Sequence, residues 1–156
     1  MISKKTPFIL YGGDYNPDQW PKETIIEDMK FFKLANINTV TLPVFSWALL
    51  QPDEDTYNFE WLDDILETLK ENNIYVCMAT STAVQPTWMS KKYPEILPTD
   101  FQGRKRKFGG RVNFCPNSEK YREFSVNLAT ILAERYKDYP NIIAWHISNE
   151  YANYCY

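Results

Sequence analysis

The sequence lacks a long hydrophobic run, a regular set of cysteines and an excess of positive charge. It contains no stretch of about 18 apolar residues and no apolar signal peptide at its N-terminus, so we expect a cytoplasmic protein without a membrane partner. Its three cysteines are widely spaced and odd in number, which does not predict a disulfide framework. A net charge of -3 and a pI near 5.2 argue against a nucleic-acid partner.

Aromatic residues, in contrast, are abundant and make up 16% of the chain. Exposed aromatic rings commonly hold the apolar faces of sugar rings, although a tyrosine-rich core would give the same composition. The one basic run, residues 104–107, is short and lies between glycines. It therefore favours a solvated loop over a nucleic-acid patch.

Short apolar runs alternate along the chain with segments of helical periodicity. The predicted strands are residues 8–11, 39–44, 74–80 and 142–147, and the predicted helices are residues 23–35, 61–70 and 117–137, with a short helix near residues 87–92. Residues 45–57 and most of residues 81–116 are predicted to be loops. This alternation predicts one α/β domain, residues 1–156, with a parallel sheet that helices cover on both faces.

Polar side chains follow the end of each predicted strand. They are Asp14 and Asn16, then Ser46 with Trp47, then residues 80–82, and finally Asn149 and Glu150. Reactive residues of parallel α/β folds gather at this edge of the sheet. A carboxylic acid beside a carboxamide suits glycoside hydrolysis, where the acid protonates the departing oxygen. The Asn-Glu pair alone is a weak signal, and without further context it favours a solvated or helix-capping glutamate.

Six segments, in order along the chain, resemble those of glycoside hydrolase family 42 β-galactosidases. They are residues 11–21 (YGGDYNPDQWP), 45–52 (FSWALLQP), 57–63 (YNFEWLD), 79–83 (ATSTA), 111–118 (RVNFCPNS) and 145–151 (WHISNEY). The resemblance extends over about residues 8–156 and implies the first half of a (β/α)8 TIM barrel, about four βα units, truncated after the fourth strand.

The resemblance also implies roles for three residues in the hydrolysis of terminal β-galactosides with net retention. Glu150 corresponds to the general acid/base, the proton donor. Asn149 would bind the sugar 2-hydroxyl, an interaction that strengthens in the transition state. Arg111 matches a family arginine that would bind Glu150 or the sugar. The expected substrate is a β-galactoside oligosaccharide.

The catalytic nucleophile is expected after a seventh strand, outside these 156 residues. Retaining hydrolysis requires two carboxyl groups about 5 Å apart, and no carboxylate of this chain is an evident partner for Glu150. We therefore expect the chain to be inactive by itself, and if it is active, the second carboxylate must be sought among Asp14, Glu54 and Asp100. Open outer strands also predict self-association.

Cys115 and Cys155 coincide with cysteines that some family members use in a four-cysteine zinc site. A tetrahedral structural site requires four ligands, so two cysteines cannot complete it. An incomplete half-site, with structural zinc in the full-length protein, and two unrelated thiols are both open interpretations. Catalysis is expected to require no cofactor, and the full-length protein is expected to be a homo-oligomer.

Two alternative functions stay open at the level of sequence. One is another retaining glycosidase with the same barrel, such as a mannanase or cellulase, which would share the Asn-Glu pair. The other is a non-catalytic carbohydrate-binding fragment that keeps the aromatic residues and Arg111. The opening segment, residues 11–21, favours the β-galactosidase.

Overall fold

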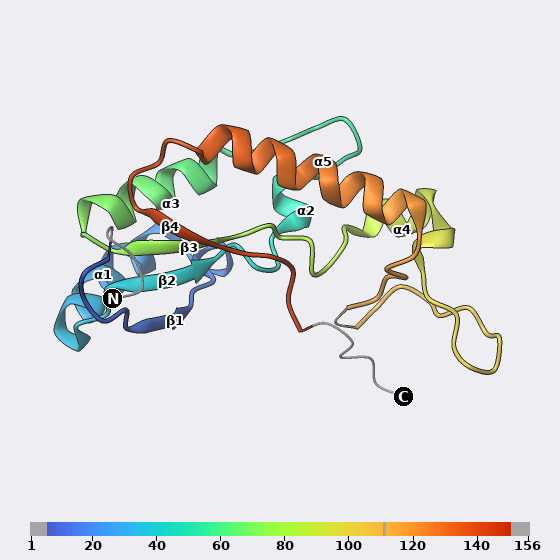
Figure 1. Cartoon of the computed structure of the whole chain (residues 1–156), viewed down its shortest axis with the longest axis horizontal. Coiled ribbons are helices and arrows are strands. Elements are labelled where there is room, and N and C mark those ends of the chain that lie inside the picture. Colours follow the sequence, from blue (N-terminus) through green and yellow to red (C-terminus); the bar gives the residue numbers. More distant parts are fainter. Residues whose placement is uncertain (1–5, 111, 151–156) are drawn as a thin grey trace.

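The chain folds around one parallel four-stranded sheet, in a computed structural model that describes residues 6–110 and 112–150. The strands are β1 (Gly12–Asp14), β2 (Thr39–Leu42), β3 (Tyr75–Ala79) and β4 (Ile142–His146). They lie in chain order, and each pairs in parallel with the next. Figure 1 shows the strands fanned out beside the helices.

Three long helices connect successive strands, as predicted. They are α1 (Lys22–Ala35), α3 (Glu60–Glu71) and α5 (Glu119–Tyr136). The loops after the strands hold four short helices: α2 (Trp47–Leu50), α4 (Thr87–Lys92), and the 3-10 helices η1 (Pro17–Gln19) and η2 (Pro94–Ile96). Helix α4 matches its predicted range, whereas α2 was predicted to be loop because one turn is too short to show a helical period.

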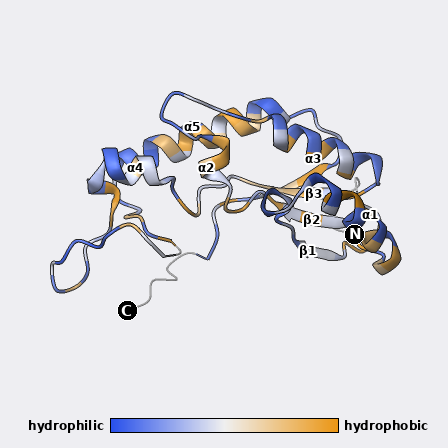
Figure 2. Cartoon of the chain, turned by 180° about the vertical axis from the view of Figure 1, so that it is seen from behind, coloured by the Kyte–Doolittle hydropathy of each residue, from blue (hydrophilic) through white to orange (hydrophobic). Residues whose placement is uncertain are grey.

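The three long helices pack on one face of the sheet, so the expectation of helices on both faces is wrong for the described residues. Right-handed connections between neighbouring parallel strands place successive helices on the same side. In β2, Val40 and Leu42 join the core beneath the helices, whereas Thr39 and Thr41 face the other way and are half-buried. Figure 2 shows the hydrophobic side of α5 turned toward the strands.

The first strand lies four residues later than predicted. The apolar residues 8–11 precede β1, and the strand itself begins at Gly12. A Cβ atom at Gly12 would lie 1.7 Å from the carbonyl oxygen of Thr39, so only glycine allows this close approach to β2. The strand is therefore specified by contact with its neighbour, which apolar patterning does not reveal.

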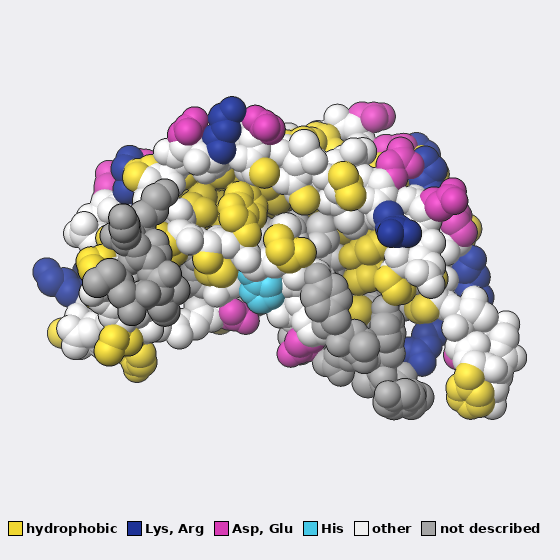
Figure 3. All heavy atoms as spheres, viewed as in Figure 1, with side chains coloured by type: hydrophobic (Ala, Val, Ile, Leu, Met, Phe, Trp, Pro, Cys, Tyr) yellow, Lys and Arg dark blue, Asp and Glu magenta, His cyan; other side chains and the backbone are white. Residues whose placement is uncertain are grey.

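The outer strands are more exposed than the middle ones. All three residues of β1 are exposed, and Trp145 and Ile147 at the end of β4 have exposed side chains. Figure 3 shows hydrophobic side chains gathered along β4 and under α5 on this face. Within residues 6–110 and 112–150, none of the helices has the length and hydropathy of a membrane span.

Candidate active site

The ends of the four strands bring the predicted polar residues to one edge of the sheet. Because every neighbouring pair is parallel, the carboxyl ends of all four strands meet there. Asp14 ends β1 with an exposed side chain, and Asn149 and Glu150 follow β4 within four residues. Asn149 is half-buried and Glu150 is exposed. An acid and an amide therefore stand at the open rim of the sheet, accessible to a substrate.

The end of β3 supplies buried hydroxyl groups to this edge. Thr80, Ser81 and Thr82 are all buried. The Thr80 and Thr82 hydroxyl oxygens are 2.8 Å apart, and the Ser81 hydroxyl donates to the carbonyl of Pro43 after β2. The sequence placed polar residues here but did not reveal that their hydroxyl groups bind neighbouring strand ends.

The segment that follows β4 has an unusual backbone. Ser148 has a φ of 61° and Glu150 a φ of 44°, both in the left-handed region. For residues other than glycine such conformations cost of order 1–3 kcal/mol each and persist only where the surroundings hold them. Ser148 is buried, and its N–H donates to the Thr80 hydroxyl over 3.2 Å. The loop that carries Glu150 is thus fixed by a side chain from the neighbouring strand.

The long loop after β3 is held together by a buried glutamine. Gln85 is buried, and its side-chain amide donates to Ser90 over 3.1 Å and to the carbonyl of Asn113. Arg111 lies outside the described residues. The next residue, Val112, is buried with a φ of 53°, which is rare for a β-branched side chain. Sequence reasoning missed Gln85, because nothing in the pattern shows that a glutamine is buried.

A second buried glutamine joins the loops after β2 and β3. Gln51 accepts from the indole N–H of Trp47 over 2.9 Å and donates to the Glu54 carbonyl over 2.8 Å. The backbone carbonyl of Gln51 accepts from the indole N–H of Trp88 over 2.9 Å. Trp47 is fully buried, so in the described structure it packs the core and does not present a face to a sugar.

Two of the three alternative carboxylates are already bound by neighbouring groups. Glu54 pairs with Lys92 and accepts from the Tyr93 hydroxyl over 2.7 Å, and these hydrogen bonds hold the pKa of Glu54 below its usual range. Asp100 accepts from the backbone N–H of Arg104 over 2.9 Å and from its side chain, which lowers the pKa of Asp100. Neither lies at the carboxyl end of a strand. Asp14, the last residue of β1, is the one of the three that does.

The described residues do not form a metal site. Cys115 is a half-buried free thiol, and no group of three or more potential metal ligands occurs within residues 6–110 and 112–150. Cys155 lies outside the described residues. One thiol without further ligands does not fit a tetrahedral zinc site, so the described part of the chain supports no step that depends on a metal.

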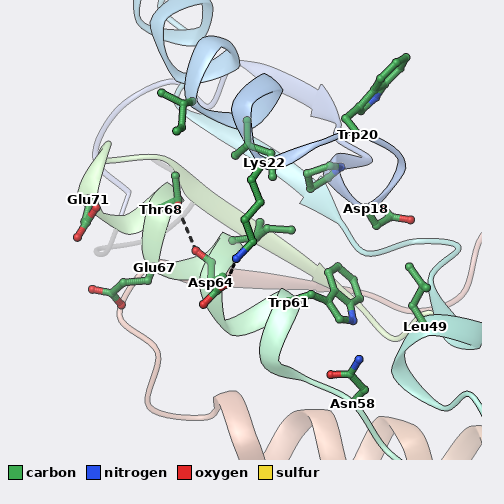
Figure 4. Close-up of a pocket in the computed structure, with 14 residues that line it drawn as sticks. Asp18, Trp20, Lys22, Leu49, Asn58, Trp61, Asp64, Glu67, Thr68 and Glu71 are labelled. Atoms are coloured by element: carbon green, nitrogen blue, oxygen red, sulfur yellow. Dashed lines mark hydrogen bonds and ion pairs between the residues drawn. The ribbon is translucent and has the colours of Figure 1, made fainter.

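A separate cleft of about 690 Å³ lies on the helical side of the sheet, between α1 and α3. Trp61 lines it, and Lys22 and Asp64 form an ion pair of 2.7 Å across it (Figure 4). Neither Asn149 nor Glu150 is among its lining residues. This cleft is therefore separate from the strand ends that carry Asn149 and Glu150.

Comparison with known proteins identifies the relatives of this chain. The family model described as beta-galactosidase, of glycoside hydrolase family 42, matches residues 14–156. A β-galactosidase from Planococcus sp. (strain L4) is 62% identical over the whole chain, and one from Lactobacillus acidophilus is 52% identical over 94% of it. These matches confirm the resemblance inferred from the six segments.

Solved structures agree with the fold. The crystal structure of a β-galactosidase from Bacillus circulans sp. alkalophilus covers the whole chain with a TM-score of 0.96 and 60% identity. A family 39 glycoside hydrolase from Bacteroides cellulosilyticus covers 89% with a TM-score of 0.60 and 14% identity, which shows the fold alone. The predicted α/β class, the first half of a barrel, is confirmed.

The chain is much shorter than these relatives. It spans 23% of the Planococcus protein, 22% of the Lactobacillus protein and 23% of the Bacillus circulans chain. What the relatives do as whole proteins therefore bears on this chain only through the residues that it contains.

Proposed function

We propose that this chain, which belongs to the β-galactosidase family glycoside hydrolase 42, carries the proton donor of a retaining β-galactosidase site. One observation carries the proposal. Asn149 and Glu150 lie three and four residues after the end of β4, at the edge where all four parallel strands end. Reactive residues of parallel α/β barrels are found at this edge.

In the proposed reaction Glu150 acts as acid and then as base. It donates its proton to the glycosidic oxygen while a second carboxylate attacks the anomeric carbon and forms a covalent glycosyl intermediate. Glu150 then takes a proton from the water that releases the sugar. The exposed position of Glu150 allows access to both oxygens.

Two further residues complete the proposal on this side of the site. Asn149 would donate to the sugar 2-hydroxyl, and its half-buried side chain is suited to hold one orientation. Arg111, whose family role is inferred from residues 111–118, would bind the sugar or Glu150. Each contact would contribute most in the transition state, when charge develops on the sugar ring.

The substrate class that we propose is a terminal β-galactoside. The chemistry uses only carboxyl groups and water, so we propose no cofactor for catalysis. Cytoplasmic location, the absence of nucleic-acid and membrane partners, homo-oligomer formation and structural zinc in a longer protein stay predictions. The cysteines bear on stability in this proposal and not on the reaction.

The test uses both the chain itself and a hybrid. In the hybrid, residues 1–156 replace the matching segment of the Planococcus sp. (strain L4) relative, to which the chain is 62% identical. We expect the chain alone to be inactive toward a nitrophenyl β-galactoside and toward lactose, and the hybrid to hydrolyse both. Activity of the chain alone would show that a second carboxylate lies within it, with Asp14 the first to replace.

Glu150→Gln in the hybrid then tests the proton donor. We expect hydrolysis of lactose to fall by about 10²–10⁴-fold, because its leaving group requires a proton. Formation of the glycosyl intermediate from a dinitrophenyl galactoside should change far less, because this leaving group departs without one. Glu95→Gln, at an exposed site in η2, is the matched control. If Glu150→Gln loses the same activity on both substrates, the proposed role of Glu150 is contradicted. If the unmutated hybrid binds sugar but does not hydrolyse it, the non-catalytic alternative is favoured.

A further inference from the structure

We propose that Thr80 is a positioning residue, whose buried hydroxyl group holds the loop that carries Asn149 and Glu150. This inference rests on the proposed role of Glu150 as the proton donor. Thr80 does not lie beside Glu150 in the sequence and would act through the backbone of Ser148.

Two hydrogen bonds join the end of β3 to the end of β4. The Ser148 N–H donates to the Thr80 hydroxyl over 3.2 Å, and the Thr80 N–H donates to the His146 carbonyl over 3.1 Å. Both residues are buried, with Thr80 5% and Ser148 9% exposed. Water therefore competes little for these bonds, and Ser148, the second residue of the loop, is fixed to the end of β3.

The loop needs this support because of its conformation. Ser148 and Glu150 both have positive φ values, of 61° and 44°. Left-handed backbone is unfavourable for residues that carry a Cβ atom, and it persists when neighbouring groups over-determine it. The bond to Thr80 is made by the N–H of Ser148 itself, at the first of the two strained positions. If it is lost, the backbone can relax and move the Glu150 carboxyl group.

Thr80 is itself held by a network that reaches α5. Its hydroxyl oxygen is 2.8 Å from that of Thr82, so it can accept from Ser148 and donate to Thr82 at the same time. The carbonyl of Thr82 accepts from the Tyr121 hydroxyl over 2.7 Å, and the Tyr121 ring stacks on Phe114 at 3.8 Å. The position of the acid is thereby tied to the helix layer.

A positioning role predicts an effect that depends on the leaving group. A general acid must lie within hydrogen-bonding distance of the oxygen that it protonates. If Thr80 orients Glu150, the loss of its hydroxyl should impair substrates that need a proton and spare those that do not. A role in stability alone would impair both substrates to the same extent.

The experiment compares Thr80→Val with Thr80→Ser in the same hybrid enzyme. Valine keeps the shape and removes the hydroxyl, whereas serine keeps the hydroxyl. We expect Thr80→Val to lower kcat/KM for lactose about tenfold or more. The kcat/KM for the release of dinitrophenol from the dinitrophenyl galactoside should change less than threefold. Thr80→Ser should retain most of the lactose activity. Thr68→Val, which removes a hydroxyl bonded within α3, is the control.

Equal losses on the two substrates, or no loss on lactose, would overturn the proposal. If Thr80→Val does not fold, Thr80→Ala takes its place, because alanine also lacks the hydroxyl group and is smaller than threonine. The two substrates are then compared at a lower temperature. Amide hydrogen exchange in the peptide that contains Ser148 should be faster in Thr80→Val than in Thr80→Ser. Equal exchange rates in the two variants would also contradict the proposed role of Thr80. Failure of the proposed function is recognised separately, because Glu150→Gln would then show no dependence on the leaving group.

Discussion

The middle strand β3 and the outer strand β4 have similar compositions and very different surroundings. In β3, Val76 and Met78 are fully buried, whereas Trp145 in β4 is 37% exposed. Both strands are mainly apolar. A middle strand has two neighbours and a helix above it, and an outer strand of the described structure has one neighbour. Burial in this chain is thus decided by position in the sheet.

The largest effect should come from shortening a side chain in a middle strand. Leu42 in β2 is fully buried, so Leu42→Ala should lower the free energy of unfolding by about 2–5 kcal/mol through lost contacts and a cavity. Ile147, just after β4, is 61% exposed, and Ile147→Ala should change it by less than about 0.5 kcal/mol. Urea unfolding followed by circular dichroism measures both.

If Leu42→Ala and Ile147→Ala lowered the free energy of unfolding by similar amounts, the end of β4 would be covered in solution. If Leu42→Ala has no cooperative transition, Leu42→Val provides a milder change at the same position and should cost about 1 kcal/mol. The comparison between middle and outer positions then still holds.

A smaller effect is expected on self-association. The open edge and exposed apolar side chains of β4 favour pairing between copies of the chain. Trp145→Lys places a charge there and should weaken association about tenfold, which corresponds to about 1.4 kcal/mol. Sedimentation velocity over a concentration series measures this. Trp20→Lys, at another exposed tryptophan away from β4, should leave association unchanged, and an equal effect of both variants would assign the contact to a different surface.

The smallest effect concerns the attachment of β1 to α1. The Tyr15 hydroxyl donates to Asp28 over 2.8 Å, and Tyr15→Phe should lower the free energy of unfolding by about 1 kcal/mol near neutral pH. Partial burial, reinforced by Asp28, raises the pKa of Tyr15 above its ordinary value.

This shift gives the prediction a pH dependence. The pKa of Tyr15 is higher in the folded chain than in the unfolded chain, where it is near 10. The stabilisation from Tyr15 is therefore fully present below about pH 10 and is lost as the pH rises toward the folded-state pKa. The difference between wild type and Tyr15→Phe should therefore narrow above about pH 10. Denaturation curves at pH 8 and pH 11 test this, and a constant difference would show that Tyr15 contributes through packing alone.

The sequence proposed the acid and the amide of the candidate site, but not the contacts that support them. Glu150 and Asn149 follow an apolar strand within a segment that resembles the family, which is why they could be proposed. The buried roles of Thr80 and Gln85 were not visible, because their partners lie 68 and 28 positions away. Side-chain hydrogen bonds of this kind have no local period.

The sequence by itself determined the alternation of strands and helices, the parallel α/β class and the family, because apolar periodicity and the motif segments are local properties of the chain. Tertiary structure decided where β1 begins, which face of the sheet the helices cover and how the Glu150 loop is held. Each of these depends on contact between distant segments: Gly12 with Thr39, the helices with alternate strand residues, and Ser148 with Thr80. Such contacts form only when the strands pair, so no window of the sequence contains them.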